Sequence, residues 1–235
     1  MSLRGGIAMA VQAQATQVQQ DLAFSRSYLR YKRLLDIAFT LLIGPFVLLV
    51  CLLVALCVRL DSQGPVFFRQ KRVGQNGKTF EMLKFRSMYT DNDPRLHIEK
   101  IQQYMRGEKL SEEAGEGMAY KIHKDPRITR VGRIIRKLSF DELPQFWNVL
   151  RGEMTLVGPR PPLSYEVEIY KESDWLRLSG KPGLTGTWQV YGRSRVTFQQ
   201  MVEMDIAYLH QQSLWLDLKL IVLTVPVMLL ARGGG

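Results

Sequence analysis

The sequence predicts a mainly α-helical protein with one small β-hairpin, which sits on one leaflet of a membrane as a monotopic protein. An apolar stretch over residues 34–58 is about 25 residues long, enough to enter a bilayer. Gly44-Pro45 interrupts this stretch near its middle, and cations flank it on both sides. These observations favour an N-terminal re-entrant helix that is broken at its centre, followed by a helical domain with interfacial amphipathic helices.

Length and charge narrow the class of protein. The chain has 235 residues and a formal net charge of +10, which predicts one domain with appendages. Such a charge suits nucleic acid, an anionic membrane surface or a phosphorylated substrate. No recognised nucleic-acid motif is present, so nucleic acid is not an expected partner. A non-enzymatic basic protein of the membrane surface is supported by the net charge alone.

The first 27 residues are polar and rich in Ala and Gln, which predicts a poorly ordered N-terminal tail over 1–27. They carry no apolar core of a cleavable signal peptide, so the catalytic part is expected to stay in the cytoplasm. Cys51 and Cys57 lie inside the apolar stretch and are interpreted as packing residues.

Residues 28–59 form the predicted re-entrant membrane helix. A single span usually has its cations biased to one side, whereas this stretch has them at both ends. Proline inside a helix removes one backbone hydrogen bond and bends the helix. A bent helix that enters and leaves the same leaflet explains both features, and its cations would attract anionic membrane lipid.

The predicted catalytic domain, 60–235, begins with a β-hairpin over 66–73 and 78–85. Gln75-Asn76-Gly77 supplies the turn, because Asn-Gly is a strong hairpin signal. Gly77-Lys78-Thr79 invites a P-loop reading, but Arg72 stands where the first glycine of that motif is needed.

Asp91-Asn92-Asp93 has the form by which many metal-dependent glycosyltransferases hold a nucleotide sugar and release UDP. Asn and Asp before proline are also ordinary turn and cap residues, which is the favoured reading. Residues 94–124 are read as a charged insertion. His97 and His123 have no ligand partners at metal spacing.

The chain is organised around residues 139–154, SFDELPQFWNVLRGEM. Asp141 and Glu142 are expected in a first helical turn, with Ser139 or Asp141 as the cap and Pro144 just inside. One reading is a simple capping box between Ser139 and Glu142. The nearby cations favour a second reading, because a carboxylate that attacks phosphorus needs its own charge and that of the substrate neutralised. These cations are Arg130, Arg133, Arg136, Lys137 and Arg160.

Four further elements complete the domain. Helices are expected over 163–171 and 197–209, with a glycine-containing loop over 182–190 that permits close backbone approach to a ligand. Residues 214–230 are apolar but contain Asp217, Lys219 and Pro226, which favours an interfacial C-terminal helix over a membrane span.

Four segments together resemble the bacterial sugar transferases, the monotopic polyprenyl-phosphate phosphoglycosyl transferases. They are KFRSM at 84–88, DPRITRVGR at 125–133, SFDELPQFWNVLRGEMTLVGPRPP at 139–162 and PGLTGTWQV at 182–190. The resemblance covers the chain from about Tyr31 to the C-terminus, apart from the insertion. It implies a site at the cytoplasmic face of the bacterial inner membrane.

The resemblance also implies a reaction. An aspartate at the position of Asp141 attacks the β-phosphorus of a UDP-hexose, expels UMP and becomes a covalent phosphosugar-aspartate. Polyprenyl (undecaprenyl) phosphate then takes the hexose phosphate, which starts exopolysaccharide or glycan assembly. Mg²⁺ would bridge the phosphates, with Glu142 and Asp141 as ligands. Glucose or galactose is the favoured sugar, with an N-acetylated sugar as the alternative. A homo-oligomer is compatible with the sequence.

The remaining site residues follow from the same resemblance. Arginine suits bidentate contact with phosphate, and lysine supplies a point charge. The predicted phosphate-binding residues are Arg136, Arg160, Lys84 and Arg86, and the nucleotide or loop residues are Thr185, Gly186 and Gln189.

Overall fold

The structure, a computed structural model, describes residues 26–90, 99, 102–105, 125–192 and 196–229. Residues 1–25 of the predicted N-terminal tail lie outside the described residues, and the last two residues of that tail begin the first described helix. The Asp91 and Asp93 alternative, most of the insertion, and His97 and His123 also lie outside the described residues.

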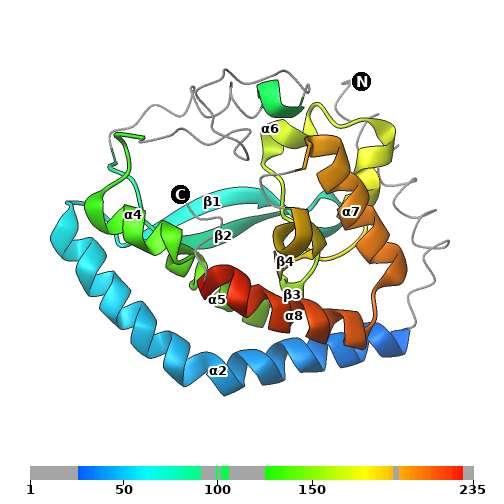
Figure 1. Ribbon diagram of the computed structural model, residues 1–235, viewed down its shortest axis with the longest axis horizontal. Helices are drawn as coiled ribbons and strands as arrows, with labels where there is room; N and C mark the ends of the chain where they lie inside the picture. The colour runs from blue at the N-terminus through cyan, green and yellow to red at the C-terminus, as the bar shows by residue number, and fades with distance from the viewer. Residues whose placement is uncertain (1–25, 91–98, 100–101, 106–124, 193–195, 230–235) are drawn as a thin grey trace.

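The N-terminal helix α2 (Arg26–Asp61) is continuous through Pro45. Figure 1 shows α2 running beneath the other elements and changing direction near its middle. The expected break is therefore a bend within one helix, because proline removes one hydrogen bond and the turns on both sides persist. Residues Ser27–Asp61 are long and apolar enough to cross a membrane, by length and composition.

Large apolar side chains cover the outward face of α2. Only 11% of its most apolar window is buried against the protein, which leaves this face without a packing partner among the described residues. The exposed residues include Leu41, Leu42, Phe46, Leu48, Leu49, Leu52, Leu53, Leu56 and Leu60. Single exposed leucines are ordinary on protein surfaces, whereas a continuous apolar surface of this kind suits contact with lipid.

The start of α2 is fixed to the rest of the protein by buried polar contacts. Asp36 accepts hydrogen bonds from Thr155 Oγ1 (2.7 Å) and the Leu156 amide (3.0 Å). Lys32 Nζ forms a buried ion pair with Asp217 Oδ2 at 2.7 Å. These contacts set the position of the helix relative to the C-terminal half of the chain.

The predicted hairpin is confirmed. Strands β1 (Phe67–Val73) and β2 (Thr79–Phe85) pair antiparallel, with Phe67 opposite Phe85 and Val73 opposite Thr79. Asn76 and Gly77 adopt the left-handed φ values of 56° and 75° that the Asn-Gly turn requires.

A second sheet was not predicted. Strands β3 (Thr155–Val157) and β4 (Gly183–Thr185) are three residues each and pair in parallel. Their close approach requires glycine at position 183, because a Cβ there would overlap the backbone nitrogen of Gly158.

The helices of the second half are mostly short. The predicted helix over 163–171 is a single turn, α6, and the predicted helix over 197–209 is confirmed as α7, with Thr197 as its cap. Their bounds are α4 Arg130–Lys137, α5 Gln145–Arg151, α6 Ser164–Val167, α7 Phe198–Gln211 and α8 Leu214–Leu229. The 3-10 helices η2 (Phe140–Glu142) and η3 (Glu172–Leu178) lie between them.

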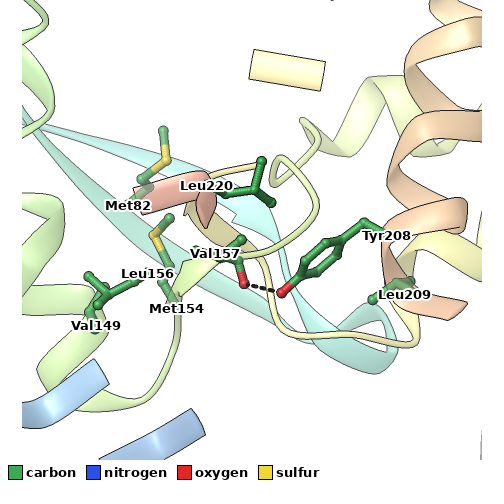
Figure 2. Close-up of a cluster of buried hydrophobic side chains, with 8 residues drawn as sticks. All are labelled: Met82, Val149, Met154, Leu156, Val157, Tyr208, Leu209 and Leu220. Carbon is green, nitrogen blue, oxygen red and sulfur yellow. Dashed lines mark hydrogen bonds between the residues drawn. The ribbon is translucent and has the colours of Figure 1, made fainter. Parts of the chain in front are cut away.

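The main core gathers side chains from β2, α5, β3, α7 and α8 (Figure 2). The Tyr208 hydroxyl lies within hydrogen-bond distance of the Val157 carbonyl (3.1 Å) and of Asp217 (2.5 Å). Helix α8 therefore buries one face, including Asp217 and Leu220, while Trp215 on the same helix is 77% exposed. The predicted C-terminal helix is present, and its place at the interface stays a prediction.

Candidate active site

Asp141 and Glu142 lie side by side in η2, in the short segment that joins α4 to α5. The expected helical turn is present as η2, which follows Ser139, but Ser139 has a left-handed φ of 57° and its side chain makes no cap hydrogen bond. Helix α5 begins at Gln145, and Pro144 precedes it instead of lying inside. The capping-box alternative is thereby excluded, and the two carboxylates need another explanation.

Apolar packing holds this turn in place. Phe140 and Leu143, on either side of the carboxylates, pack against the buried cluster of Val54, Val58, Phe85 and Ile135. This cluster joins η2 to the second half of α2, so the carboxylates are fixed close to the helix with the exposed apolar face.

Glu142 is paired with Lys84, whose Nζ lies 2.7 Å from Glu142 Oε1. Burial by itself raises the pKa of Glu142, but the positive charges of Lys84, Arg72 and Arg160 outweigh it and hold that pKa below its usual value. Glu142 is therefore ionised at neutral pH and available to a cation.

Asp141 differs from its neighbour. Burial raises its pKa to about 6, the negative charge of Glu142 adds to this effect, and Lys84 and Arg136 oppose it. Asp141 is thus mostly ionised at pH 7 while remaining more basic than an ordinary aspartate. Two adjacent carboxylates with different pKa values are typical of a catalytic pair.

Arg72 belongs to this cluster and was not predicted. It is buried on β1, where it donates to the Pro161 carbonyl at 2.9 Å. Burial and the nearby Arg160 lower its pKa to about 10. The hairpin register was the available signal. Arg72 lies opposite Phe80, and Lys84 is on the same face as Phe80 because alternate residues of a strand share a face.

Arg160 lies in the turn after β3. Its Nη1 is 3.2 Å from the buried Glu166, and its charge lowers the pKa of Glu142. Of the four predicted phosphate-binding residues, Lys84, Arg136 and Arg160 therefore lie close enough to lower the pKa of Asp141 or of Glu142 by their positive charge.

Arg86 is placed differently. Its Nη2 donates to the Ser62 carbonyl at 2.6 Å and the Val58 carbonyl at 3.3 Å, near the C-terminal end of α2. A cation is stabilising there because it faces the negative end of the helix dipole. Arg86 thus joins β2 to α2, and its contact with phosphate stays a prediction.

The predicted loop residues line the junction of β4 and α8. Thr185 Oγ1 lies 2.8 Å from Thr224 Oγ1, and Gln189 Nε2 donates to the Leu184 carbonyl at 3.2 Å. A Cβ on Gly186 would overlap the Gly158 carbonyl. These contacts are made within the protein, and nucleotide binding by these residues stays a prediction.

The site has two carboxylates to offer a metal. Within the described ranges, no three His, Cys, Asp or Glu side chains gather at one point. Mg²⁺ commonly binds one or two carboxylates and completes its shell with substrate phosphates and water. Asp141 and Glu142 therefore fit Mg²⁺ bound together with a diphosphate substrate, and they do not form a complete protein cage.

Comparison with known proteins gives the family. A sequence profile described as "Bacterial sugar transferase" matches residues 27–231. The chain is 42% identical over 219 residues to the galactosyl transferase CpsE of Streptococcus agalactiae, covering 91% of this chain and 46% of CpsE. It is 39% identical over 196 residues to the exopolysaccharide production protein ExoY of Rhizobium meliloti, covering 83% of this chain and 81% of ExoY.

A third relative is named for its reaction. It is the UDP-glucose:undecaprenyl-phosphate glucose-1-phosphate transferase of Caulobacter vibrioides, 38% identical over 206 residues, which cover 84% of this chain and 69% of that protein. The chain spans about half the length of CpsE and most of ExoY. The match from α2 to α8 includes the carboxylate pair and the cations around it, and the chain belongs to the bacterial sugar transferase family.

Proposed function

We propose that this chain transfers a hexose 1-phosphate from a UDP-hexose to polyprenyl phosphate and releases UMP. The observation that carries the proposal is Asp141, a carboxylate with a pKa near 6, next to an ionised Glu142 and among cations. The reactions named for the relatives supply the substrate class.

The reaction proceeds in two displacements at one phosphorus atom. An Asp141 oxygen attacks the β-phosphorus of the UDP-hexose, the bond to the α-phosphate oxygen breaks, and UMP leaves. A phosphate oxygen of polyprenyl phosphate then attacks the same phosphorus and returns the Asp141 carboxylate. The product is a polyprenyl diphosphate sugar, and the covalent phosphosugar-aspartate lies between the two steps.

The residues of this chain meet the electrostatic needs of both steps. A carboxylate and a diphosphate repel one another, so the positive charges of Lys84, Arg136 and Arg160 lower the cost of their approach. Bound Mg²⁺ would neutralise further phosphate charge, with Glu142 and Asp141 as its protein ligands. Lys84 pairs with Glu142 in this structure, and it would be available to a substrate phosphate if Mg²⁺ were bound by that carboxylate.

The membrane arrangement follows from the second substrate. Polyprenyl phosphate keeps its phosphate at headgroup level, so the nucleophile must lie near the interface. Helix α2 has an exposed apolar face and contains Pro45, and η2 packs against its second half. These features support a re-entrant helix in the cytoplasmic leaflet of the bacterial inner membrane, with anionic lipid near Arg30 and Arg59.

The test is the identity of the released nucleotide. Purified protein is incubated with UDP-glucose or UDP-galactose, Mg²⁺ and undecaprenyl phosphate, beside the Asp141→Asn variant. UMP from the wild type and none from Asp141→Asn is the expected result, and the reacting sugar identifies the substrate. Release of UDP would contradict the proposal and point to the alternative site at Asp91 and Asp93.

A further inference from the structure

Arg160 is held from two directions by residues outside the central motif. Its guanidinium Nη1 lies 3.2 Å and 3.4 Å from the two Glu166 oxygens, and its carbonyl accepts from Arg177 Nη2 at 3.2 Å. We propose that Glu166 is a positioning residue that sets where the Arg160 guanidinium points in the active site. The inference rests on the proposed function, because it assigns Arg160 to the phosphates.

Glu166 is a fixed point in this arrangement. It is 3% exposed, and its Oε2 also accepts from the Leu163 amide at 3.1 Å, which anchors the carboxylate at the start of α6. Burial alone raises the pKa of Glu166, but Arg160 and Arg72 outweigh it and keep the carboxylate ionised. A buried carboxylate is costly without a cation, so Glu166 and Arg160 hold one another.

The backbone of Arg160 is fixed independently. Arg177 is fully buried and pairs with Asp205 at 2.5 Å, and it donates to the Arg160 carbonyl. Arg72 donates to the next carbonyl, that of Pro161. With the turn clamped in this way, the direction of the Arg160 guanidinium depends on its side-chain torsions, which Glu166 restricts.

Loss of the Glu166 charge has a definite consequence. Arg160 already acts electrostatically on Glu142, so once released it gains an alternative partner in the carboxylate that is proposed to hold Mg²⁺. Misdirection of a phosphate-binding group costs transition-state stabilisation. Removing a negative charge does not weaken attraction of an anionic substrate, so the loss should appear in kcat and the KM for the UDP-hexose should not rise.

The variant that isolates the charge is Glu166→Gln, which keeps a side-chain oxygen for the Leu163 amide. Its matched control is Asp174→Asn. Asp174 is 2% exposed and accepts from the Lys171 amide at 3.0 Å, so it caps η3 as Glu166 caps α6, with its other bond from Ser173. We expect Glu166→Gln to lower kcat about tenfold to a hundredfold and Asp174→Asn to leave it unchanged.

The decisive measurement is a double-mutant cycle with Arg160→Ala, read as UMP release. If Glu166 acts through Arg160, adding Glu166→Gln to Arg160→Ala changes kcat by less than about twofold. If Glu166→Gln does not fold, Glu166→Asp replaces it in the same cycle, with the charge kept and its reach shortened.

Three results would overturn the inference. One is an equal loss of kcat with and without Arg160, which would make Glu166 a structural residue. Another is an equal loss in Asp174→Asn, which would assign the effect to helix capping. A third is the absence of UMP release by the wild type from every UDP-hexose tested; this contradicts the proposed function, and the inference falls with it.

Discussion

Asn148 ties the two segments that carry the active site. It is fully buried on α5, where its Oδ1 accepts from the Leu83 amide at 3.0 Å. Its Nδ2 donates to the Glu81 carbonyl at 2.8 Å and to Glu153 Oε2 at 2.7 Å. Since Lys84 follows Leu83 on β2 and η2 precedes α5, one amide side chain keeps Lys84 in register with Glu142.

The variant Asn148→Ala removes three hydrogen bonds at once. Two are between neutral groups and contribute about 1 kcal/mol each, and the bond to the carboxylate contributes about 1.5 kcal/mol or more. The expected loss of unfolding free energy is about 3 to 4 kcal/mol. For a chain of this size that lowers Tm by about 6 to 16 °C.

Thermal unfolding of detergent-solubilised protein, followed by intrinsic fluorescence, measures this difference. The control is Arg151→Gln on the same helix, where a 57% exposed arginine pairs with Glu153 at 3.2 Å. An exposed pair contributes at most about 1 kcal/mol, so this control should shift Tm by less than about 4 °C. A Tm for Asn148→Ala within the range of the control would refute the reasoning.

Two further predictions concern pH and the contact between helices α2 and α8. Because the pKa of Asp141 is about 6 and only its ionised form attacks phosphorus, kcat/KM for UMP release should fall as the pH drops through about 6 and level off above it; a profile that stays flat to pH 5 would argue against Asp141 as the nucleophile. Asp217→Asn should cost about 3 to 5 kcal/mol of unfolding free energy because it leaves Lys32 buried without its partner, and Lys32→Met should cost a similar amount. Melting temperatures of both variants and of the double variant check this, since the double variant should lose less than the sum; strict additivity would contradict a coupled pair.

Local patterns predicted local structure well. The Asn76-Gly77 turn and the flanking strands are as expected, because Asn-Gly favours left-handed φ values whatever surrounds it. Thr197 exchanges hydrogen bonds with Gln200 to begin α7, which is again a contact between near neighbours.

The turn that carries Asp141 shows where local patterns mislead. Ser139 followed by acidic residues has the composition of a helix start, yet Phe140 and Leu143 must both reach the cluster around Phe85. Tertiary packing therefore decides the conformation: Ser139 takes a left-handed φ, and α5 is delayed to Gln145.

Contacts between segments that are far apart along the chain could not be predicted from the sequence. Strands β3 and β4 are too short to show a hydrophobic pattern. Their pairing depends on the close approach of Gly158 and Gly183, which are far apart along the chain. Glu166 reads as an ordinary helix residue until α6 brings it to Arg160. Motif resemblance found the carboxylates and most of the cations, whereas the buried groups that hold them required the fold.

The most direct test of the central claim is to look for the covalent intermediate. Protein is incubated with a UDP-hexose and Mg²⁺ without polyprenyl phosphate, and its intact mass and peptides are measured by mass spectrometry, beside Asp141→Asn. The account predicts an added mass of one hexose phosphate on the peptide that contains Asp141, which disappears when polyprenyl phosphate is supplied and is absent from Asp141→Asn. An adduct on another residue, or UMP release by wild-type protein whose Asp141 stays unmodified throughout, would contradict it.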